Sequence, residues 1–240
     1  MATTNDVELF ELFWENSKLN PATIAEFGRR VNAYAADGQR DVALAQAGPD
    51  YPMSSPNDSL QKLMTARKSV RSWSPRPVSM KQLGSLMAAF AKSRSGMRTF
   101  PSAGATYAVE TYCLLNRVEG ELNGSVVRYN ADNHSLSVVG GGPAPGEIAT
   151  LINLEGDGSL PPLIFVIALF AERTTAKYGE RGGRFALIEA GQALQNLALR
   201  LEVEGMAGVE LGGLLDDRVR ALLKLERKVK IALGYACGHV

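Results

Sequence analysis

The stretch that decides the fold is LIFVIALF at residues 163–170. Its residues are all apolar and three of them are β-branched, which is typical of a strand buried on both faces of a sheet. The same reasoning predicts further strands over 106–118, 125–129, 135–139 and 229–235, with turn-forming residues at 130–133 between the second and the third. A sheet therefore lies at the centre of the protein.

One long helix is predicted beside this sheet, over residues 183–204, because Leu187, Leu194 and Leu201 recur on one stripe at helical spacing. A Gly-rich loop is expected after it, over 208–215. Shorter helices are predicted before residue 20, from there to about 36, over 59–68, from residue 79, and from Asp216 to about 223. Along the chain, helices come first, strands follow, and a helix and a last strand end it. This order indicates the α+β class.

The best boundary along the chain lies at 48–57, where three prolines indicate a linker or surface loop. We therefore expect an N-terminal helical segment, residues 1–58, and a main domain, residues 59–240. A chain of 240 residues with 45% hydrophobic residues can bury a substantial core.

Charge and cysteine content exclude several classes of protein. The net charge of +1 gives no overall attraction to nucleic acid or an acidic membrane. Two cysteines and two histidines argue against a disulfide framework or a zinc site, so no metal is expected. The N-terminus lacks a secretory signal, and the longest apolar run, 160–171, is shorter than the roughly 20 residues of a membrane span. A cytoplasmic protein is expected.

The charge is nevertheless uneven, since residues 61–100 contain nine Lys and Arg and no Asp or Glu. Within them, Arg67-Lys68-Ser69-Val70-Arg71 groups three cations and a hydroxyl, which suits a phosphate monoester. A solvated basic helix end explains the same residues. A nucleic-acid surface fits less well, because aromatic residues are not interleaved and the flanks are acidic.

A small-residue loop follows at 100–105, where the backbone could approach a flat ring closely, although an ordinary tight turn has the same composition. The familiar nucleotide signatures are missing: the chain has neither the dinucleotide-binding Gly-x-Gly-x-x-Gly after a strand nor a P-loop, and it has no Gly-x-Ser-x-Gly elbow.

Together these residues resemble the nitroreductase-type FMN proteins, and most of all their SagB-type branch, the azoline dehydrogenases of thiazole/oxazole-modified peptide biosynthesis. The resemblance covers roughly residues 60–238, with a weaker early stretch at 14–18. The motifs that carry it are 67–71, 101–107 with Glu110 and Tyr112, the helix with Glu189 and Gln195-Asn196-Leu197, and Leu211-Gly212-Gly213-Leu214 before Asp216-Asp217.

The resemblance implies an α+β homodimer whose mostly antiparallel central sheet is flanked by helices, with FMN at the subunit interface. The FMN phosphate and ribityl chain would be held by Arg67, Lys68, Ser69 and Arg71, which match the phosphate-binding segment of the family. The loop of Pro101, Ser102, Ala103 and Gly104 would lie against the isoalloxazine, across the dimer in relatives. Gly212 and Gly213 would face the reactive edge of the flavin.

Lys177 and Tyr178 match the Lys-Tyr signature of the azoline dehydrogenases. Aromatising an azoline removes a proton from one ring carbon and a hydride from its neighbour, so a base must lie beside the hydride acceptor. Both side chains have reference pKa values of about 10, so either would need burial or a nearby cation to act near neutral pH. Which of the two accepts the proton stays open, and both would otherwise be ordinary loop residues.

The function implied is an FMN-dependent dehydrogenase that oxidises thiazoline or oxazoline rings of a ribosomally made peptide, with hydride to flavin N5 and electrons to dioxygen. Such enzymes serve antibiotic biosynthesis, and the expected partners are a second copy, the peptide and cyclodehydratase proteins. The alternatives are a general NAD(P)H-dependent nitro or quinone reductase and a non-catalytic scaffold subunit. Ala108 stands where the family usually has proline, and with the sequence ending at Val240 we expect phosphate binding to rest more heavily on residues 67–71.

Overall fold

A six-stranded sheet forms the centre of the computed structural model, which describes residues 8–37, 51–153 and 160–240. The strand order is β3-β2-β1-β4-β6-β5, and each neighbouring pair is antiparallel. This confirms the α+β class and the antiparallel sheet expected from the sequence. The strands are β1 (Val109–Leu115), β2 (Ser125–Asn130), β3 (Ser135–Gly141), β4 (Leu163–Leu169), β5 (Ala207–Leu211) and β6 (Lys230–Gly238).

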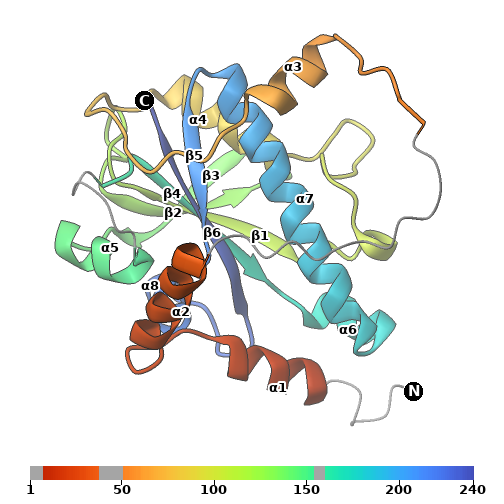
Figure 1. The fold of residues 1–240 in the computed structure, drawn as a ribbon, viewed down its shortest axis with the longest axis vertical. Coiled ribbons are helices and arrows are strands. Elements are labelled where there is room, and N and C mark those ends of the chain that lie inside the picture. The colour runs from red at the N-terminus through yellow and green to blue at the C-terminus, as the bar shows by residue number, and fades with distance from the viewer. Residues whose placement is uncertain (1–7, 38–50, 154–159) are drawn as a thin grey trace.

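Helices cover both faces of the sheet, and the longest of them crosses one face diagonally (Figure 1). Among the described helices, none has both the length and the apolar composition that a bilayer span requires. The helices are α1 (Glu8–Ser17), α2 (Ile24–Asp37), α3 (Ser59–Ala66), α4 (Met80–Met87), α5 (Pro145–Ile152), α6 (Glu172–Tyr178), α7 (Arg181–Val203) and α8 (Asp216–Leu222).

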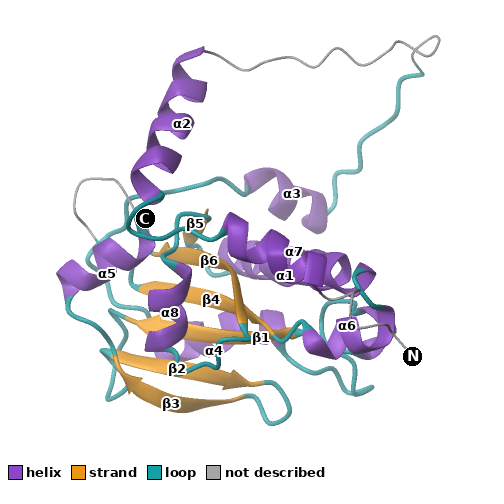
Figure 2. Cartoon of the chain, turned by 90° about the horizontal axis from the view of Figure 1, so that it is seen from below, coloured by secondary structure: helices purple, strands orange, loops and turns teal. Residues whose placement is uncertain are grey.

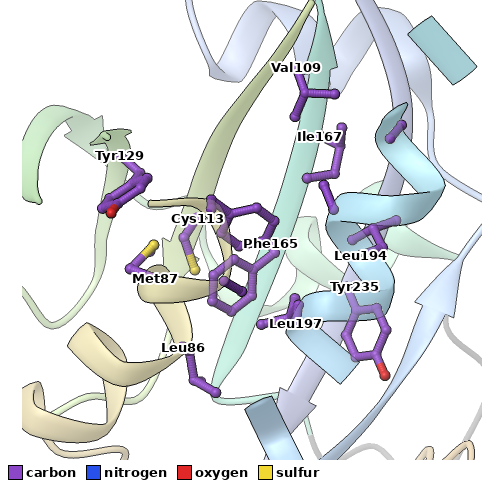
Figure 3. Packing of buried hydrophobic residues seen from close by; sticks show 14 of the residues in the cluster. Leu86, Met87, Val109, Cys113, Tyr129, Phe165, Ile167, Leu194, Leu197 and Tyr235 are labelled. Atoms are coloured by element: carbon purple, nitrogen blue, oxygen red, sulfur yellow. The ribbon is translucent and has the colours of Figure 1, made fainter. Parts of the chain in front are cut away.

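Strand β4 is buried along its whole length, as its continuous apolar sequence predicts. Successive side chains of a strand point to opposite faces, so β4 supplies two cores. Phe165 and Ile167 join the core beneath α7, whereas Ile164 and Val166 join the core beneath α5 and α8. Figure 3 shows Phe165 and Ile167 on the side of Leu194 and Leu197 of α7. The sheet is therefore the shared middle layer of the molecule.

The prediction of a loop over 208–215 was wrong for its first half, because residues Ala207–Leu211 form β5. The glycines of this segment favour a loop locally, but Val209 and Leu211 become buried when β5 pairs with β6. Helices α5 and α6 were not expected either. Most other boundaries fall within a few residues of the prediction, and the helix expected over 59–68 ends at Ala66.

The two N-terminal helices differ in how they meet the rest of the protein. Helix α1 packs on α7, with the Phe10 ring occupying the space that a side chain at Gly183 would need. Helix α2 instead stands away from the sheet (Figure 2). Residues 48–50 of the expected linker lie outside the described residues, and 51–57 form no helix or strand. The division at residue 58 stays a prediction.

Candidate functional site

The basic motif after α3 forms one wall of a polar pocket. Backbone N–H of Val70 donates to the Gly208 carbonyl at 3.0 Å, which holds this segment extended beside β5. In an extended chain alternate side chains point to the same side. Arg67, Ser69 and Arg71 accordingly line a pocket of about 440 Å³, and Lys68 does not.

The other lining residues come from distant parts of the sequence. They are Gln195 and Ala198 of α7, Val209 and Glu210 of β5, and Tyr235 of β6. Burial raises the pKa of Tyr235 above its ordinary value, so its hydroxyl stays protonated and can donate a hydrogen bond.

The donors of this pocket fit a phosphate ester. Neither Arg67 nor Arg71 forms an ion pair with any residue that the structure describes, and Glu210 is the one acid in the lining. Two guanidiniums with a hydroxyl can bind several phosphate oxygens at once and outweigh this carboxylate. We call this pocket the phosphate pocket.

The Gly212–Gly213 turn follows β5 and borders a smaller hollow of about 200 Å³. A side chain at Gly212 would meet no atom within 4 Å, so the backbone there is open to a flat ring. Asp216 lines the same hollow and accepts a hydrogen bond from the Leu19 N–H at 3.3 Å. Burial raises the pKa of Asp216 from 3.8 to about 6. The turn thus combines an open backbone with a carboxyl that titrates near neutrality.

The loop at 101–104 is held on its inner side by Glu189 of α7, whose side chain is buried and only 2% exposed. The Ser102 hydroxyl donates to one Glu189 oxygen at 2.5 Å and accepts from the Tyr107 N–H at 2.9 Å. The other Glu189 oxygen accepts from the Val109 N–H at 3.0 Å. The Ser102 side chain therefore points into the protein, which leaves the backbone, Pro101 and Ala103 to meet a ligand.

Lys177 and Tyr178 lie against this loop. The Lys177 ammonium donates to the Gly104 carbonyl at 3.3 Å, and a side chain at Gly104 would collide with both Lys177 Nζ and Tyr178 Oη. Gly104 also has a φ of +57°, which favours glycine. Tyr178 in turn packs edge-on against Phe185. We call Gly104, Lys177 and Tyr178 the loop cluster.

Two further hydrogen bonds join α6 to the same loop. The Thr106 and Thr174 hydroxyls lie 3.0 Å apart, and Arg173 donates to the Tyr107 carbonyl at 2.7 Å. Arg173 also pairs at 2.8 Å with Glu110, a buried carboxylate of β1. The loop and the end of α6 therefore form a single rigid unit.

Within one chain, α6 with Lys177 and Tyr178 and the phosphate pocket contact different parts of α7. Gly182 packs on Thr174 of α6, whereas Gln195 of the phosphate pocket comes thirteen residues later. At 1.5 Å per residue this is about 20 Å along the helix axis. The predicted site residues thus form three groups within a single copy of the chain: the phosphate pocket, the Gly212–Gly213 turn, and the loop with Lys177 and Tyr178.

The comparison with known families decides the classification. Residues 64–239 match the model of the nitroreductase family. The chain belongs to the nitroreductase family. Members of this family are FMN-dependent oxidoreductases. A Methanocaldococcus jannaschii protein named as a nitroreductase is 31% identical over 169 residues, which is 70% of this chain and 85% of that protein.

Solved structures share the nitroreductase fold. A Ralstonia eutropha protein described as a nitroreductase has a TM-score of 0.66 at 22% identity, over 80% of this chain and 87% of its own. The E. coli microcin synthetase complex McbBCD, solved with a truncated pro-MccB17 bound, has a TM-score of 0.65 at 20% identity. That match covers 94% of this chain and 96% of the other. A Vibrio harveyi NADPH:FMN oxidoreductase matches with a TM-score of 0.52 at 16% identity, over 76% and 69%.

Several residues of this nitroreductase-family site were not among the predicted ones. Tyr235 and Gln195 join the phosphate pocket from β6 and α7, Glu189 supports the loop, and Asp216 faces the hollow at Gly212. From the sequence, Glu189, Gln195 and Asp216 are only parts of the resemblance, without a role in the site, and Tyr235 is not singled out, because a Tyr in a strand has an ordinary structural role. Among residues 8–37, 51–153 and 160–240, no group of three His, Cys, Asp or Glu could hold a metal ion.

Proposed function

We propose that the protein is an FMN-dependent dehydrogenase that oxidises thiazoline or oxazoline rings in a ribosomally made peptide to thiazole or oxazole. The observation that carries this proposal is the contact of Lys177 with the Gly104 carbonyl, beside Tyr178. It joins the Lys-Tyr signature of the azoline dehydrogenases to the loop expected against the isoalloxazine. A general reductase of the same fold needs no such pair of bases.

Arg67, Ser69 and Arg71 would hold the FMN phosphate, with Gln195 and Tyr235 as further donors. Taking a dianionic phosphate out of water is unfavourable unless cations pair with it, which accounts for the basic motif. FMN, when bound, supplies the acceptor for the hydride. The open backbone at Gly212 and Gly213 lets the ring system approach closely.

Lys177 or Tyr178 would take the proton from the azoline carbon, and the electron pair would pass finally to dioxygen. Lys177 is exposed and Tyr178 is half-buried in the single chain. A substrate and a second subunit would bury both, and burial disfavours the ammonium form of lysine. A neutral amine is the form that accepts a proton.

A homodimer would bring the phosphate pocket and the loop cluster together. Gly182, which packs on α6, lies about 20 Å along α7 from Gln195 of the phosphate pocket, so a second copy could place its cluster over this copy's pocket. Ile188 of α7 is 57% exposed, which suits an interface. The loop and the Lys-Tyr pair form one unit, so the subunit that provides the loop also provides the bases.

A peptide substrate and cyclodehydratase partners complete the proposal. The McbBCD complex was solved with a truncated pro-MccB17 bound, and its matching chain resembles 94% of this one, a larger share than residues 64–239 of the family match. Cyclodehydratases form azolines from Cys, Ser and Thr, so they would supply the substrate. The proposed role is therefore in antibiotic biosynthesis, in which thiazole/oxazole-modified peptides are made.

The test is mass spectrometry of an azoline-containing peptide incubated with the purified holoenzyme in air. We expect a loss of two hydrogens for each ring, with the protein itself yellow. Rapid reduction of the flavin by NADPH without any ring oxidation would favour the general reductase instead. A colourless protein that does not bind added FMN would favour the scaffold subunit.

A further inference from the structure

Helix α1 lies outside the family-matched residues 64–239, yet it forms a wall of the hollow at Gly212. Phe13, Trp14 and Ser17 of this helix line the hollow opposite the turn. The helix is held in place by its own contacts, because Phe10 packs on Gly183. A segment outside the family-matched residues therefore shapes the space beside the candidate flavin site.

Charged contacts at the end of α1 add to this attachment. Lys18 pairs with Asp217 at 3.2 Å, and the Leu19 N–H donates to Asp216 at 3.3 Å. Nearer the middle of the helix, Glu11 pairs with the buried Lys230 of β6. These contacts join α1 both to the sheet and to the segment that follows the Gly212 turn.

The hollow at Gly212 is one of two adjoining spaces beside α1. The inner hollow measures about 200 Å³, and an outer hollow of about 540 Å³ lies between α1 and the first turns of α7. Phe13 and Leu187 line both of them, so the two spaces meet at these side chains. A volume of 540 Å³ is within the range of small-molecule pockets, whereas the inner hollow suits a single ring.

The two hollows differ in chemistry. The inner hollow is mostly apolar, with Asp216 as its one carboxyl. The outer hollow contains Arg181 and Arg184 on successive turns of α7. Arg181 stacks over the Phe185 ring, and neither guanidinium pairs with a carboxylate among the described residues. The acid in the outer lining, Glu180, already accepts from the Leu9 N–H at 3.2 Å.

We propose that these two hollows together form the peptide-binding groove, with the reacting ring in the inner hollow and a neighbouring carboxylate-bearing residue in the outer one. The inference rests on the proposed function. Two guanidiniums without acidic partners can bind a carboxylate bidentately, so Arg181 and Arg184 select a peptide with an acidic group beside the ring. Helix α1 is then the wall that determines which peptide fits.

The fluorescence of Trp14 reports on binding in the inner hollow, because this side chain lines it. The chain has two tryptophans, and Trp73 is buried in the core with its indole N–H bonded to the Ala207 carbonyl. Trp73→Phe leaves Trp14 as the single indole. The holoprotein with this substitution is titrated with four short peptides, each containing one thiazole. Three are amidated and have Asp, Asn or Lys beside the ring, and the fourth has Asn and a free C-terminal carboxylate.

We expect the Asp peptide to change Trp14 emission and to bind at least about 10-fold more tightly than the amidated Asn peptide, about 1.4 kcal/mol. Comparing the free-carboxylate peptide with the Asp peptide shows which carboxylate is preferred. Arg181→Gln with Arg184→Gln should abolish the preference, and Arg218→Gln on α8 serves as the control. Equal binding of all four peptides, or no change in emission, overturns the groove.

Phe13→Ala is the second variant, since it tests the inner hollow without changing a charge. It should weaken binding of every thiazole peptide while FMN occupancy stays at the wild-type level; unchanged affinity counts against the groove. The groove and the proposed function can fail separately. Selective peptide binding without ring oxidation would refute the dehydrogenase, whereas ring oxidation without selective binding would refute the groove.

Discussion

The Ser102 hydroxyl donates a 2.5 Å hydrogen bond to Glu189, a carboxylate buried in the middle of α7. Through this bond the long helix determines the shape of the loop whose Gly104 carbonyl binds Lys177. Burial raises the pKa of Glu189, while its hydrogen bonds to Ser102 and Val109 partly counter this effect. One side chain of the core thus positions a candidate base that it does not touch.

Replacing Glu189 tests this support. Glu189→Leu leaves the Ser102 hydroxyl and the Val109 N–H without their acceptor, which should lower the free energy of unfolding by about 2–5 kcal/mol. Glu189→Gln should cost less, because its oxygen can still accept from Val109 and its amide can donate to Ser102. Urea denaturation of the wild-type protein and the two variants measures the free energy of unfolding of each. Equal losses in the two variants would show that the hydrogen bonds are unimportant.

A methyl group at Gly104 should displace the candidate base. Gly104→Ala collides with Lys177 and Tyr178, so azole formation should fall by at least about 100-fold, or about 2.7 kcal/mol. Gly96→Ala is the matched control, because Gly96 also has a positive φ, +84°, but its nearest atom is a Lys92 carbon at 3.9 Å. Both variants strain the backbone, and only the first should lose turnover. Similar turnover in the two would disprove the role of the loop cluster.

The phosphate pocket predicts a contrast between neighbouring residues. Arg67→Ala and Arg71→Ala each remove charge-assisted hydrogen bonds of about 1.5–3 kcal/mol, so FMN affinity should fall roughly 10- to 100-fold. Lys68→Ala should change it little, since Lys68 does not line the pocket. Titration by quenching of flavin fluorescence measures all three. A large effect at Lys68 would mean that the phosphate lies elsewhere.

A site shared between subunits can be tested with hybrid dimers. Arg67→Ala and Lys177→Ala copies carrying different tags are co-expressed, and the dimer with both tags is isolated. If each site takes its pocket from one copy and its loop cluster from the other, one of the two sites in the hybrid is intact. Assayed at an FMN concentration that leaves the Arg67→Ala protein largely without flavin, the hybrid should then show about half the wild-type turnover, well above that of either variant alone. An inactive hybrid would place both groups in the same subunit.

Asp216 should make stability depend on pH in the acid range. Its pKa is about 6 in the folded protein and 3.8 ordinarily, so between these values the folded state binds more protons than the unfolded state. The free energy of unfolding should therefore fall as pH rises from about 4 to 6. Asp216→Asn should flatten this slope in urea titrations across the range. Glu121→Gln, at an exposed position, is the control, and an unchanged slope in Asp216→Asn would refute the assignment.

The sequence predicted the parts of the fold that local patterns determine. Strand β4 and helix α7 have apolar patterns strong enough to identify them without their neighbours. Strand β5 was missed because glycines surround Val209 and Leu211, whose burial comes only from pairing with β6. Helix α6 was missed because seven mostly polar residues give no clear periodicity.

The candidate site shows the same limit. The spacing of Arg67, Ser69 and Arg71 suited a phosphate ester but fitted a solvated basic helix end as well, so the sequence alone left both interpretations open. Tyr235 could not be added to this motif, because the antiparallel pairing of β5 with β6 is what brings this residue to the pocket. The contact between Lys177 and Gly104 likewise depends on how α6 packs, which no local pattern encodes.

The seat of Phe10 on the bare backbone of Gly183 makes α1 a replaceable part. That contact needs a ring on one side and a missing side chain on the other, and with the ion pairs of Glu11 and Lys18 it holds the helix without involving Arg67, Ser69 or Arg71. Chimaeras that exchange the first twenty residues between relatives with a glycine at this position should therefore acquire the donor's choice of peptide while keeping the recipient's affinity for its nucleotide.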